Sequence, residues 1–172
     1  MQTMSEYAWV ISSVGLVLVF IGWQVVYFNA KKLATRSESK SAIDHLIKIL
    51  NEISDFSCTY WLSGGKSTSD ATFYLFSIMS KVTQSYEFVK ILQRRGISIS
   101  DEYLTNVSMG ATLDCEAVSG FSPDELTAHA QEVMERCMSM ISHIYQQFED
   151  RYPAIKEETL EEWSQNLGPK QG

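Results

Sequence analysis

The chain has 172 residues, of which 45% are hydrophobic and 20% are charged, which is room for one folded domain with a short appendage. Its formal net charge of −7 argues against binding of long DNA or RNA, because proteins neutralise nucleic-acid phosphates with Lys and Arg. Its three cysteines form no Cys-x-x-Cys pair and have no histidine at zinc-ligand spacing, so we expect buried free thiols and no structural metal.

A long uncharged run, YAWVISSVGLVLVFIGWQVVY, extends from Tyr7 to Tyr27. As a helix it would be about 31 Å long at ~1.5 Å per residue, which is the thickness of the hydrocarbon core of a bilayer. Aromatic residues that favour membrane interfaces stand at both ends of the run: Tyr7, Trp9, Trp23 and Tyr27. A cleaved signal peptide is the alternative, but no Lys or Arg precedes the run, and bulky Phe28 lies where a cleavage site needs small side chains. We therefore predict an uncleaved transmembrane helix over residues 7–28, after an outer tail of residues 1–6.

The charges that flank this run predict its orientation. Glu6 is the only charged residue before it, whereas four basic residues follow it: Lys31, Lys32, Arg36 and Lys40. Because basic residues are retained on the cytoplasmic side, the N-terminus should face outward and residues 31–172 should face the cytoplasm. We expect a single-pass protein of the inner (cell) membrane, in contact with the lipid bilayer.

Small residues recur on one face of the predicted transmembrane helix: Ala8, Ser12, Gly15, Val19, Gly22 and Val26. Small residues let helix backbones approach closely in lipid, so this face is typical of a helix that associates with its own copies. Two interpretations stay open. The helix either self-associates and opens in a multimer, or it is a plain anchor that tolerates glycine.

Residues 29–40 form a polar and basic juxtamembrane connector, which can contact anionic headgroups. The sequence leaves open whether the transmembrane helix continues through this connector or breaks near Ser37. From Ala42 onward, apolar residues recur at helical spacing, which predicts a helix that ends at about Leu62, before Gly64-Gly65.

Residues 41–172 are predicted to form an all-α cytoplasmic domain, a bundle of four or five helices. A second helix should run from Asp70 to Arg95 and stop at Gly96. Its apolar face consists of Leu75, Ile78, Met79, Val82, Tyr86, Val89 and Leu92. A short helix is expected from Asp101 to Met109, followed by a loop or by another turn of helix.

The stretch FSPDEL is a strong signal for the start of a helix. Ser122 can cap the helix and Pro123 suits its first position. This helix should end before Pro153, because the residue that precedes a proline disfavours helical backbone. A final short helix is expected from Ile155 to Asn166.

The stretch WLSGGKSTSD, residues 61–70, contains the Gly-Lys-Ser ending of a phosphate-binding P-loop. A P-loop needs another glycine five residues before Gly65, where this chain has Tyr60. A P-loop also follows a buried strand, whereas the segment upstream of Gly65 has helical spacing. A nucleotide-hydrolysing enzyme is therefore disfavoured.

The same stretch can still bind an anion at the start of the next helix. A helix N-terminus offers free N–H groups and a positive dipole, and Lys66 adds a charge. The candidate ligand-binding residues are Lys66, Ser67, Thr68, Tyr60 and Trp61, with the two aromatic residues as a stacking face. The alternative is a structural turn in which Ser67, Thr68 or Ser69 caps the next helix.

No constellation of catalytic residues is visible in the sequence. The three histidines, His45, His129 and His143, stand alone on predicted helices. A run of acidic residues is typical of a solvated helix face: Glu157, Glu158, Glu161 and Glu162. We therefore predict a protein that is not an enzyme, with no catalytic residue, no metal ligand and no cofactor.

An outer tail, one apolar span from Tyr7 to Tyr27 and a compact helical domain without a catalytic motif resemble a class of bacterial antiphage membrane effectors associated with type III CRISPR systems. The resemblance covers the whole chain as architecture, and no binding residue is carried over from it. It implies a homo-oligomer, taken as a tetramer, whose cytoplasmic domains bind a cyclic oligoadenylate such as cyclic tetra-adenylate. It also implies that the multimer perturbs the membrane through its spans.

Two hypotheses for the function follow, with an enzyme in third place. The first is a ligand-gated membrane effector that binds cyclic tetra-adenylate between subunits. The second is a membrane-tethered adaptor or assembly protein that recruits a protein partner and binds no small molecule.

Overall fold

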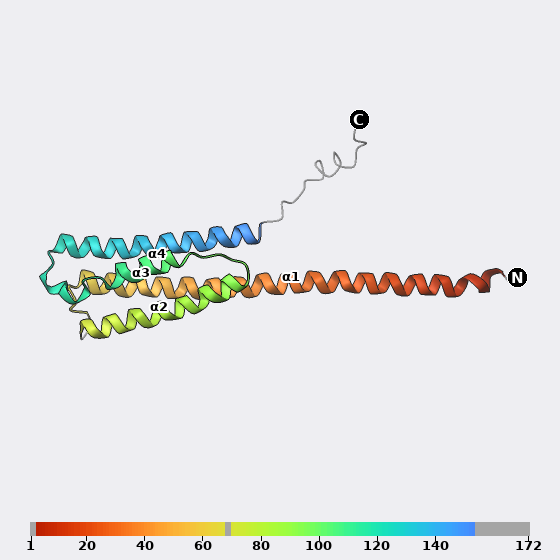
Figure 1. Ribbon diagram of the computed structural model, residues 1–172, viewed down its shortest axis with the longest axis horizontal. Coiled ribbons are helices and arrows are strands. Elements are labelled where there is room, and N and C mark those ends of the chain that lie inside the picture. The colour runs from red at the N-terminus through yellow and green to blue at the C-terminus, as the bar shows by residue number, and fades with distance from the viewer. Residues whose placement is uncertain (1–2, 68–69, 154–172) are drawn as a thin grey trace, which may run out of the picture.

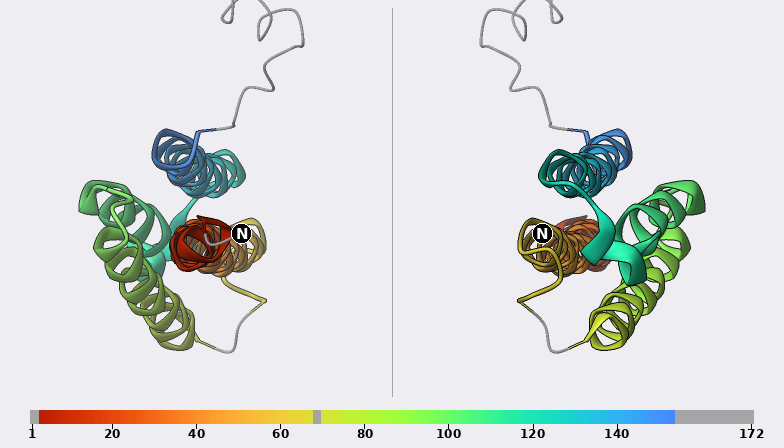
Figure 2. Two further views of the ribbon diagram at one scale, coloured as in Figure 1. Left: turned by 90° about the vertical axis from the view of Figure 1, so that its right-hand side faces the viewer. Right: turned by 90° about the vertical axis from the view of Figure 1, so that its left-hand side faces the viewer.

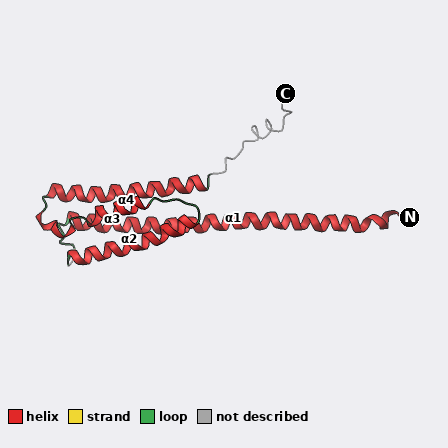
Figure 3. Cartoon of the chain, in the orientation of Figure 1, coloured by secondary structure: helices red, strands yellow, loops and turns green. Residues whose placement is uncertain are grey.

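The structure is a computed structural model, and it describes residues 3–67 and 70–153. Over these ranges the chain is all-helical with no strand (Figure 3), which confirms the predicted fold class. The elements in chain order are α1 (Thr3–Leu62), α2 (Ala71–Arg94), α3 (Asp101–Thr112), the 3-10 helix η1 (Cys115–Gly120) and α4 (Pro123–Arg151). The final helix expected from Ile155 to Asn166 lies outside the described residues.

α1 is one uninterrupted helix of 60 residues, about 90 Å long at ~1.5 Å per residue. The connector therefore continues the helix, and the break considered near Ser37 does not occur. Neither glycine nor proline is present in residues 23–62, so this part of the sequence does not favour a kink. Hydroxyls that could compete with the helix bond back to the preceding turn, since Thr35 donates to Lys31 O at 2.9 Å and Ser39 donates to Thr35 O at 2.8 Å.

The N-terminal half of α1 stands alone, whereas the other helices pack on its C-terminal half (Figure 1). From Ser12 to Phe28 every residue is exposed except Gln24, which is half-buried, and most of these side chains are large and apolar. We call residues 12–28 the apolar segment. It makes α1 the one helix in the described part of the chain that is long and apolar enough to cross a membrane.

α2, α3 and α4 pack along the C-terminal half of α1 and enclose one apolar core (Figures 1 and 2). α1 contributes large side chains at helical spacing, among them Leu46, Leu50 and Ile53, which are fully buried. Each such side chain stabilises the fold by about 1.5–3 kcal/mol when it leaves water. An ion pair of Lys81 with Glu52 joins α2 to α1 at the surface.

We call the end of the bundle next to the apolar segment the proximal end, and the opposite end the distal end. At the proximal end the C-terminal turns of α2 and α4 are tied to α1. Arg95, just after α2, pairs with Glu38 at 3.1 Å, and Tyr152, just after α4, has its hydroxyl 3.3 Å from that of Ser39. Residues 29–38 therefore separate the bundle from the apolar segment by only about 15 Å of helix, at ~1.5 Å per residue.

Most of the predicted helix ends are confirmed. α4 begins with a capping box of Ser122 and Glu125, and α2 ends before Gly96, whose φ is +79°. The helix expected from Asp101 to Met109 extends to Thr112. The segment after it, left open between a loop and a helical turn, forms η1.

The apolar face predicted for α2 is wider than the part that packs into the core. Ile78, Val89 and Leu92 are buried, whereas Met79 and Tyr86 are 42% and 41% exposed. The side chains at the edge of this face therefore lie at the surface of the bundle.

Tyr74→Phe tests the contact between α2 and α3. Tyr74 is fully buried, and its hydroxyl donates to the carbonyl oxygen of Ala111 in the last turn of α3 at 2.7 Å. Removal of the hydroxyl leaves that carbonyl without its partner, so we expect a loss of about 1–3 kcal/mol in the free energy of unfolding. Tyr145→Phe, at a residue that is 48% exposed, should change it by less than ~0.5 kcal/mol. Thermal unfolding of the full chain in detergent micelles measures both changes, and equal midpoints for the two variants would contradict the contact.

Candidate functional site

The predicted ligand-binding residues lie at the distal end, where α1 turns toward α2. Gly64 and Gly65 have φ values of +61° and +78°, which favour glycine. Their N–H groups donate to the carbonyl oxygens of Trp61 at 2.9 Å and Tyr60 at 3.0 Å, and so close the end of α1. A Cβ on Gly65 would lie 2.7 Å from a methyl carbon of Val118 in η1. The glycine pair is thus a tightly packed helix stop, as the sequence predicts.

Tyr60 and Trp61 are part of the core, with 1% and 0% of their surfaces exposed. The ring of Tyr60 stacks on Tyr74 at 3.8 Å between centroids, and its hydroxyl donates to the carbonyl oxygen of Cys115 at 2.7 Å. The ring of Trp61 stacks on His129 at 4.4 Å. Contrary to the stacking role expected from the sequence, neither ring offers a free face to a ligand, because both are packed against other parts of the chain.

Lys66 and Ser67 are exposed at the distal end, and Thr68 lies outside the described residues. Ser67 closes the turn, since its N–H donates to Ser63 Oγ at 3.1 Å and its hydroxyl donates to Thr59 O at 3.3 Å. Of the predicted site residues, the structure therefore brings Lys66 and Ser67 together at the surface. It separates them from the two buried rings.

Asp70 caps α2, in place of the serine or threonine expected at residues 67–69. Its carboxylate accepts a hydrogen bond from the N–H of Thr72 at 3.2 Å. A carboxylate at this position uses a free N–H and complements the positive end of the helix dipole. A ligand phosphate would meet this negative charge, so the start of α2 is a poorer anion site than the sequence predicts.

The distal end also carries acidic residues beyond this cap. Burial raises the pKa of Tyr60, and the carboxylates of Asp70 and Glu116 raise it further. Lys66 is the one basic residue in the described turn of residues 63–67. A single cation among these carboxylates gives one copy of the chain little net attraction for a phosphate.

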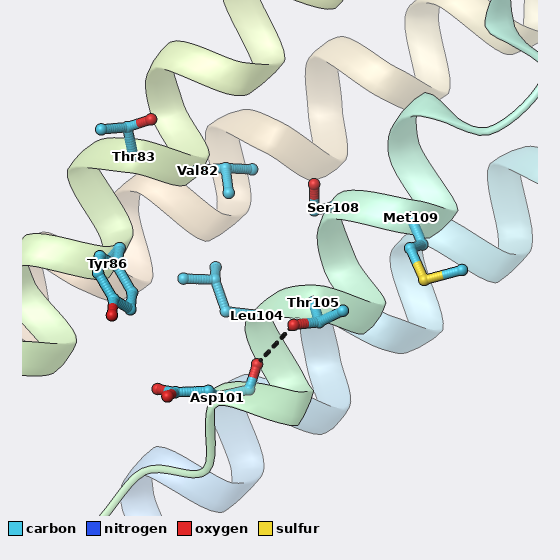
Figure 4. A pocket seen from close by; sticks show the side chains of 8 residues that line it. All are labelled: Val82, Thr83, Tyr86, Asp101, Leu104, Thr105, Ser108 and Met109. Atoms are coloured by element: carbon cyan, nitrogen blue, oxygen red, sulfur yellow. Dashed lines mark hydrogen bonds between the residues drawn. The ribbon is translucent and has the colours of Figure 1, made fainter.

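A groove of about 350 Å³ lies between α2 and α3 (Figure 4). Val82 and Tyr86 come to it from α2 and Leu104 comes from α3. The hydroxyl of Thr105 is already engaged, because it donates to the carbonyl oxygen of Asp101 at 3.0 Å. The side chains that line the groove include no basic residue, so it suits an apolar partner better than a nucleotide phosphate.

A second cavity, of about 810 Å³, lies at the proximal end between α1 and the end of α4. Arg36 and Lys40 of α1 line it together with the carboxylates of Asp44, Glu149 and Asp150, so opposite charges nearly balance there. Sequence reasoning missed both hollows, because each is built from helices that are distant along the chain. The basic residues after the apolar run were the only local signal for the proximal cavity.

Each histidine in the structure packs against an aromatic ring. His45, His129 and His143 stack on Phe88, Trp61 and Tyr103 at centroid distances of 5.8, 4.4 and 4.4 Å. Residues 3–67 and 70–153 contain no cluster of His, Cys, Asp or Glu that could hold a metal ion. The three thiols are free, and burial raises the pKa of Cys137 to about 12, so this thiol stays protonated at neutral pH.

No protein-family model, curated protein or solved structure matches this chain. Function therefore has to be inferred from the geometry of the chain itself. Two features of that geometry are unusual for a simple anchor: the single helix that joins the apolar segment to the bundle, and the apolar surface over α2 and α3.

Gly65→Ala should destabilise the bundle, because alanine would be forced into a left-handed conformation and its Cβ would clash with Val118. We expect a loss of about 1–3 kcal/mol in the free energy of unfolding. Gly120→Ala is the matched control and should be close to neutral, since nothing lies within 4 Å of the added Cβ. Thermal unfolding of both variants measures the difference. A Gly65→Ala protein as stable as Gly120→Ala would show that the glycine pair is not a structural stop.

Proposed function

We propose that this protein is a membrane-anchored effector, in which copies of the chain associate and act on the bilayer through their apolar segments. The observation that carries the proposal is the continuity of α1, which is at once the apolar segment and a wall of the bundle. A protein that only tethers a domain to a membrane needs a linker of no particular stiffness. Here the connection is a rigid helix.

The proximal contacts prevent α1 from moving independently of the bundle. Glu38 is held by Arg95 after α2, and Ser39 lies against Tyr152 after α4. Any change in how two bundles lie against each other therefore changes how their apolar segments lie in the membrane. A ligand could drive such a change only through different affinities for the two arrangements.

The side of α1 that the bundle leaves uncovered continues the small-residue face of the apolar segment. At ~3.6 residues per turn, this face runs in register through Gly15, Val19, Gly22, Val26, Ala30, Ala34, Ser37 and Ser41. In the bundle it continues through exposed Asp44 and Lys48. Two parallel α1 helices could approach closely along the small residues, and Asp44 of each copy could pair with Lys48 of the other.

We place the apolar segment in the inner (cell) membrane, with the N-terminus outside and the bundle in the cytoplasm. Support comes from the exposed basic residues that separate the apolar segment from the bundle: Lys31, Lys32, Arg36 and Lys40. Each basic residue close to an anionic surface contributes ~1 kcal/mol of attraction. The short span of residues 29–38 keeps the proximal end of the bundle near the headgroups.

We propose cyclic tetra-adenylate as the trigger, as the resemblance to antiphage effectors implies. Lys66 and Ser67 are the exposed candidates for contact with its phosphates. A symmetric multimer would multiply the single Lys66 charge around a ring-shaped ligand, while Asp70 opposes binding in every copy. Lys66 and Asp70 act on a bound phosphate in opposite directions, so the affinity for cyclic tetra-adenylate has to be measured. The proposed role of α1 does not depend on the result.

Calorimetry of the full chain in lipid nanodiscs tests the trigger. Cyclic tetra-adenylate should bind, and Lys66→Ala should weaken binding about ten-fold, which corresponds to ~1.4 kcal/mol. Arg94→Ala, at an exposed basic residue in the last turn of α2, is the matched control and should bind as the wild type does. An absence of binding to the wild-type chain would exclude this trigger and leave the role of α1 to the next experiment.

Insertions between Arg36 and Ser37 test whether α1 transmits force. A flexible Gly/Ser insertion of about two helical turns, seven residues, should abolish membrane permeabilisation by the expressed protein, because the bundle can then move independently of the apolar segment. A helical Ala/Glu/Lys insertion of the same length preserves the phase of the helix and should keep most of the activity. Dye uptake by cells that express each variant at equal level is the measurement. Equal activity of both variants would contradict an effector that acts through a rigid α1.

A membrane-tethered adaptor is the second candidate, and the groove between α2 and α3, with Val82, Tyr86 and Leu104 in its lining, favours it. An adaptor would recruit one protein partner at fixed stoichiometry and bind no small molecule. Its activity would survive both insertions, as well as Lys66→Ala and Ser67→Ala. The pair of insertions therefore separates the two candidates before any partner is identified.

A further inference from the structure

Exposed apolar side chains lie along α2 and α3, and two of them, Tyr86 and Met109, line the groove of Figure 4. They include Phe76, Met79 and Tyr86 on α2, Met109 on α3 and Leu113 just after α3, which are 41% to 70% exposed. We call these five residues the α2–α3 strip. Large apolar side chains that are exposed on two neighbouring helices are typical of a contact site rather than of a solvated face.

We propose that the α2–α3 strip is a contact between two copies of this chain, related by a two-fold axis normal to the membrane. This contact depends on the proposed function in one respect: all copies must be anchored in one bilayer with the same orientation. It identifies the face through which the bundles associate.

The distribution of charge favours a second copy as the occupant. Residues 71–80 and 103–113 contain no Asp, Glu, Lys, Arg or His, although 20% of the chain is charged. Lys81, the next charged residue on α2, pairs with Glu52 of α1. Two copies that each carry a net charge of −7 repel each other where acidic surfaces meet. Phe76, Met79, Met109 and Leu113 lie in these uncharged ranges, so two copies can meet there without that repulsion, whereas Asp101 lines the groove next to Tyr86.

The membrane anchor restricts which residues can meet. All copies have the same orientation and height above the bilayer, so a residue of one copy contacts residues of the other copy at its own level. α2 and α3 run in opposite directions beside each other (Figure 1), and Met79 Sδ lies 3.9 Å from the hydroxyl of Ser108. Met79 and Met109 therefore occupy nearly the same level within one copy.

A two-fold axis along the groove makes the strip complementary to itself. It would place Met79 of each copy against Met109 of the other, with Phe76 and Leu113 farther toward the distal end in both copies. At the level of Met79 and Met109 the contact then joins apolar side chains to apolar side chains, whereas Asp101 lines the groove and keeps its proximal part polar. The groove gives the side chains of the second copy room to interdigitate.

The other exposed methionines provide a contrast. Met134 and Met138 on α4 are 45% and 55% exposed, but Glu135 and Arg136 lie between them in the sequence. Arg136 donates to the carbonyl oxygen of Asn106 at 2.7 Å, which places this part of α4 beside the middle of α3. Met138 thus matches Met109 in residue type, exposure and approximate height, on a surface that carries charge.

Charge substitution at these two methionines tests the contact in the full chain in detergent micelles. Met109→Glu would set carboxylates against an apolar partner surface, and we expect it to lower the mass of the assembly at least two-fold by light scattering. Met138→Glu should leave the mass unchanged. Circular dichroism should give the same helix content for both variants, because both side chains are exposed.

Cysteine pairing between differently tagged chains locates the contact in native membranes. Chains with Met79→Cys, co-expressed with chains carrying Met109→Cys, should form a mixed disulfide when oxidised with copper phenanthroline. Met79→Cys with Met138→Cys should not. Only disulfides that join the two tags count, so bonds within one chain do not interfere.

The outcomes separate this contact from the proposed function. If the wild type is multimeric but its mass and cross-links do not depend on Met109, the α2–α3 strip is not the contact between copies. The proposed effector would then assemble through α1. A wild type that is monomeric at every density overturns the strip contact together with the assembly of the effector. Capture of an unrelated protein at Met109, with no mixed disulfide between copies, overturns the second copy as the occupant.

Discussion

α1 has to satisfy two environments along one axis. From Ser12 to Phe28 it is exposed and apolar on nearly every side, as a helix in lipid requires, whereas from Ser39 onward it buries one stripe and carries charge on the opposite side. Both parts share one hydrogen-bond ladder and one helical phase. The side of α1 on which α2, α3 and α4 pack therefore determines which side of the apolar segment can face a neighbouring copy. The orientation of the whole bundle above the bilayer depends on this shared phase.

The ends of the helices could be predicted from residues close together in the sequence. The predictions that were wrong concern side chains whose environment depends on residues far along the chain. Ser122 and Glu125 form their capping box within one turn, and Gly96 stops α2 through its own backbone, so both could be identified from the sequence. The burial of Tyr60 and Trp61 depends on Tyr74 and His129, which lie far along the chain. Asp70 was not predicted as the N-cap of α2, because the three hydroxyl residues that precede it are also good N-cap residues. The grooves have no sequence signature at all, since two helices have to come together to form each.

The two ends of the bundle differ in the charged residues that they carry. At the proximal end Lys40 and Arg36 line a cavity in which three carboxylates nearly balance them, whereas the acidic residues Asp70 and Glu116 lie at the distal end. An anionic ligand at the distal end has to overcome the charge of Asp70 and Glu116. In the proposed orientation, the exposed Lys31 and Lys32 between the apolar segment and the bundle would attract an anionic membrane. If two bundles meet side by side as proposed, the α2–α3 strip offers them a face with few charged residues.

The two candidate contact faces lie on different sides of the chain, which limits the assemblies it can form. Figure 4 looks onto the groove with α1 behind it, so the groove between α2 and α3 faces away from α1, while the small-residue face belongs to α1 itself. Copies in one membrane can be related only by axes normal to the bilayer, because any other two-fold axis would turn one copy upside down. If both faces form two-fold contacts, these parallel axes generate an open row. A closed tetramer would need the strip to meet the α1 face, where Asp44 and Lys48 would have to lose water against apolar side chains. In a row the apolar segments meet in pairs along α1, and the number of pairs grows with the density of protein in the membrane.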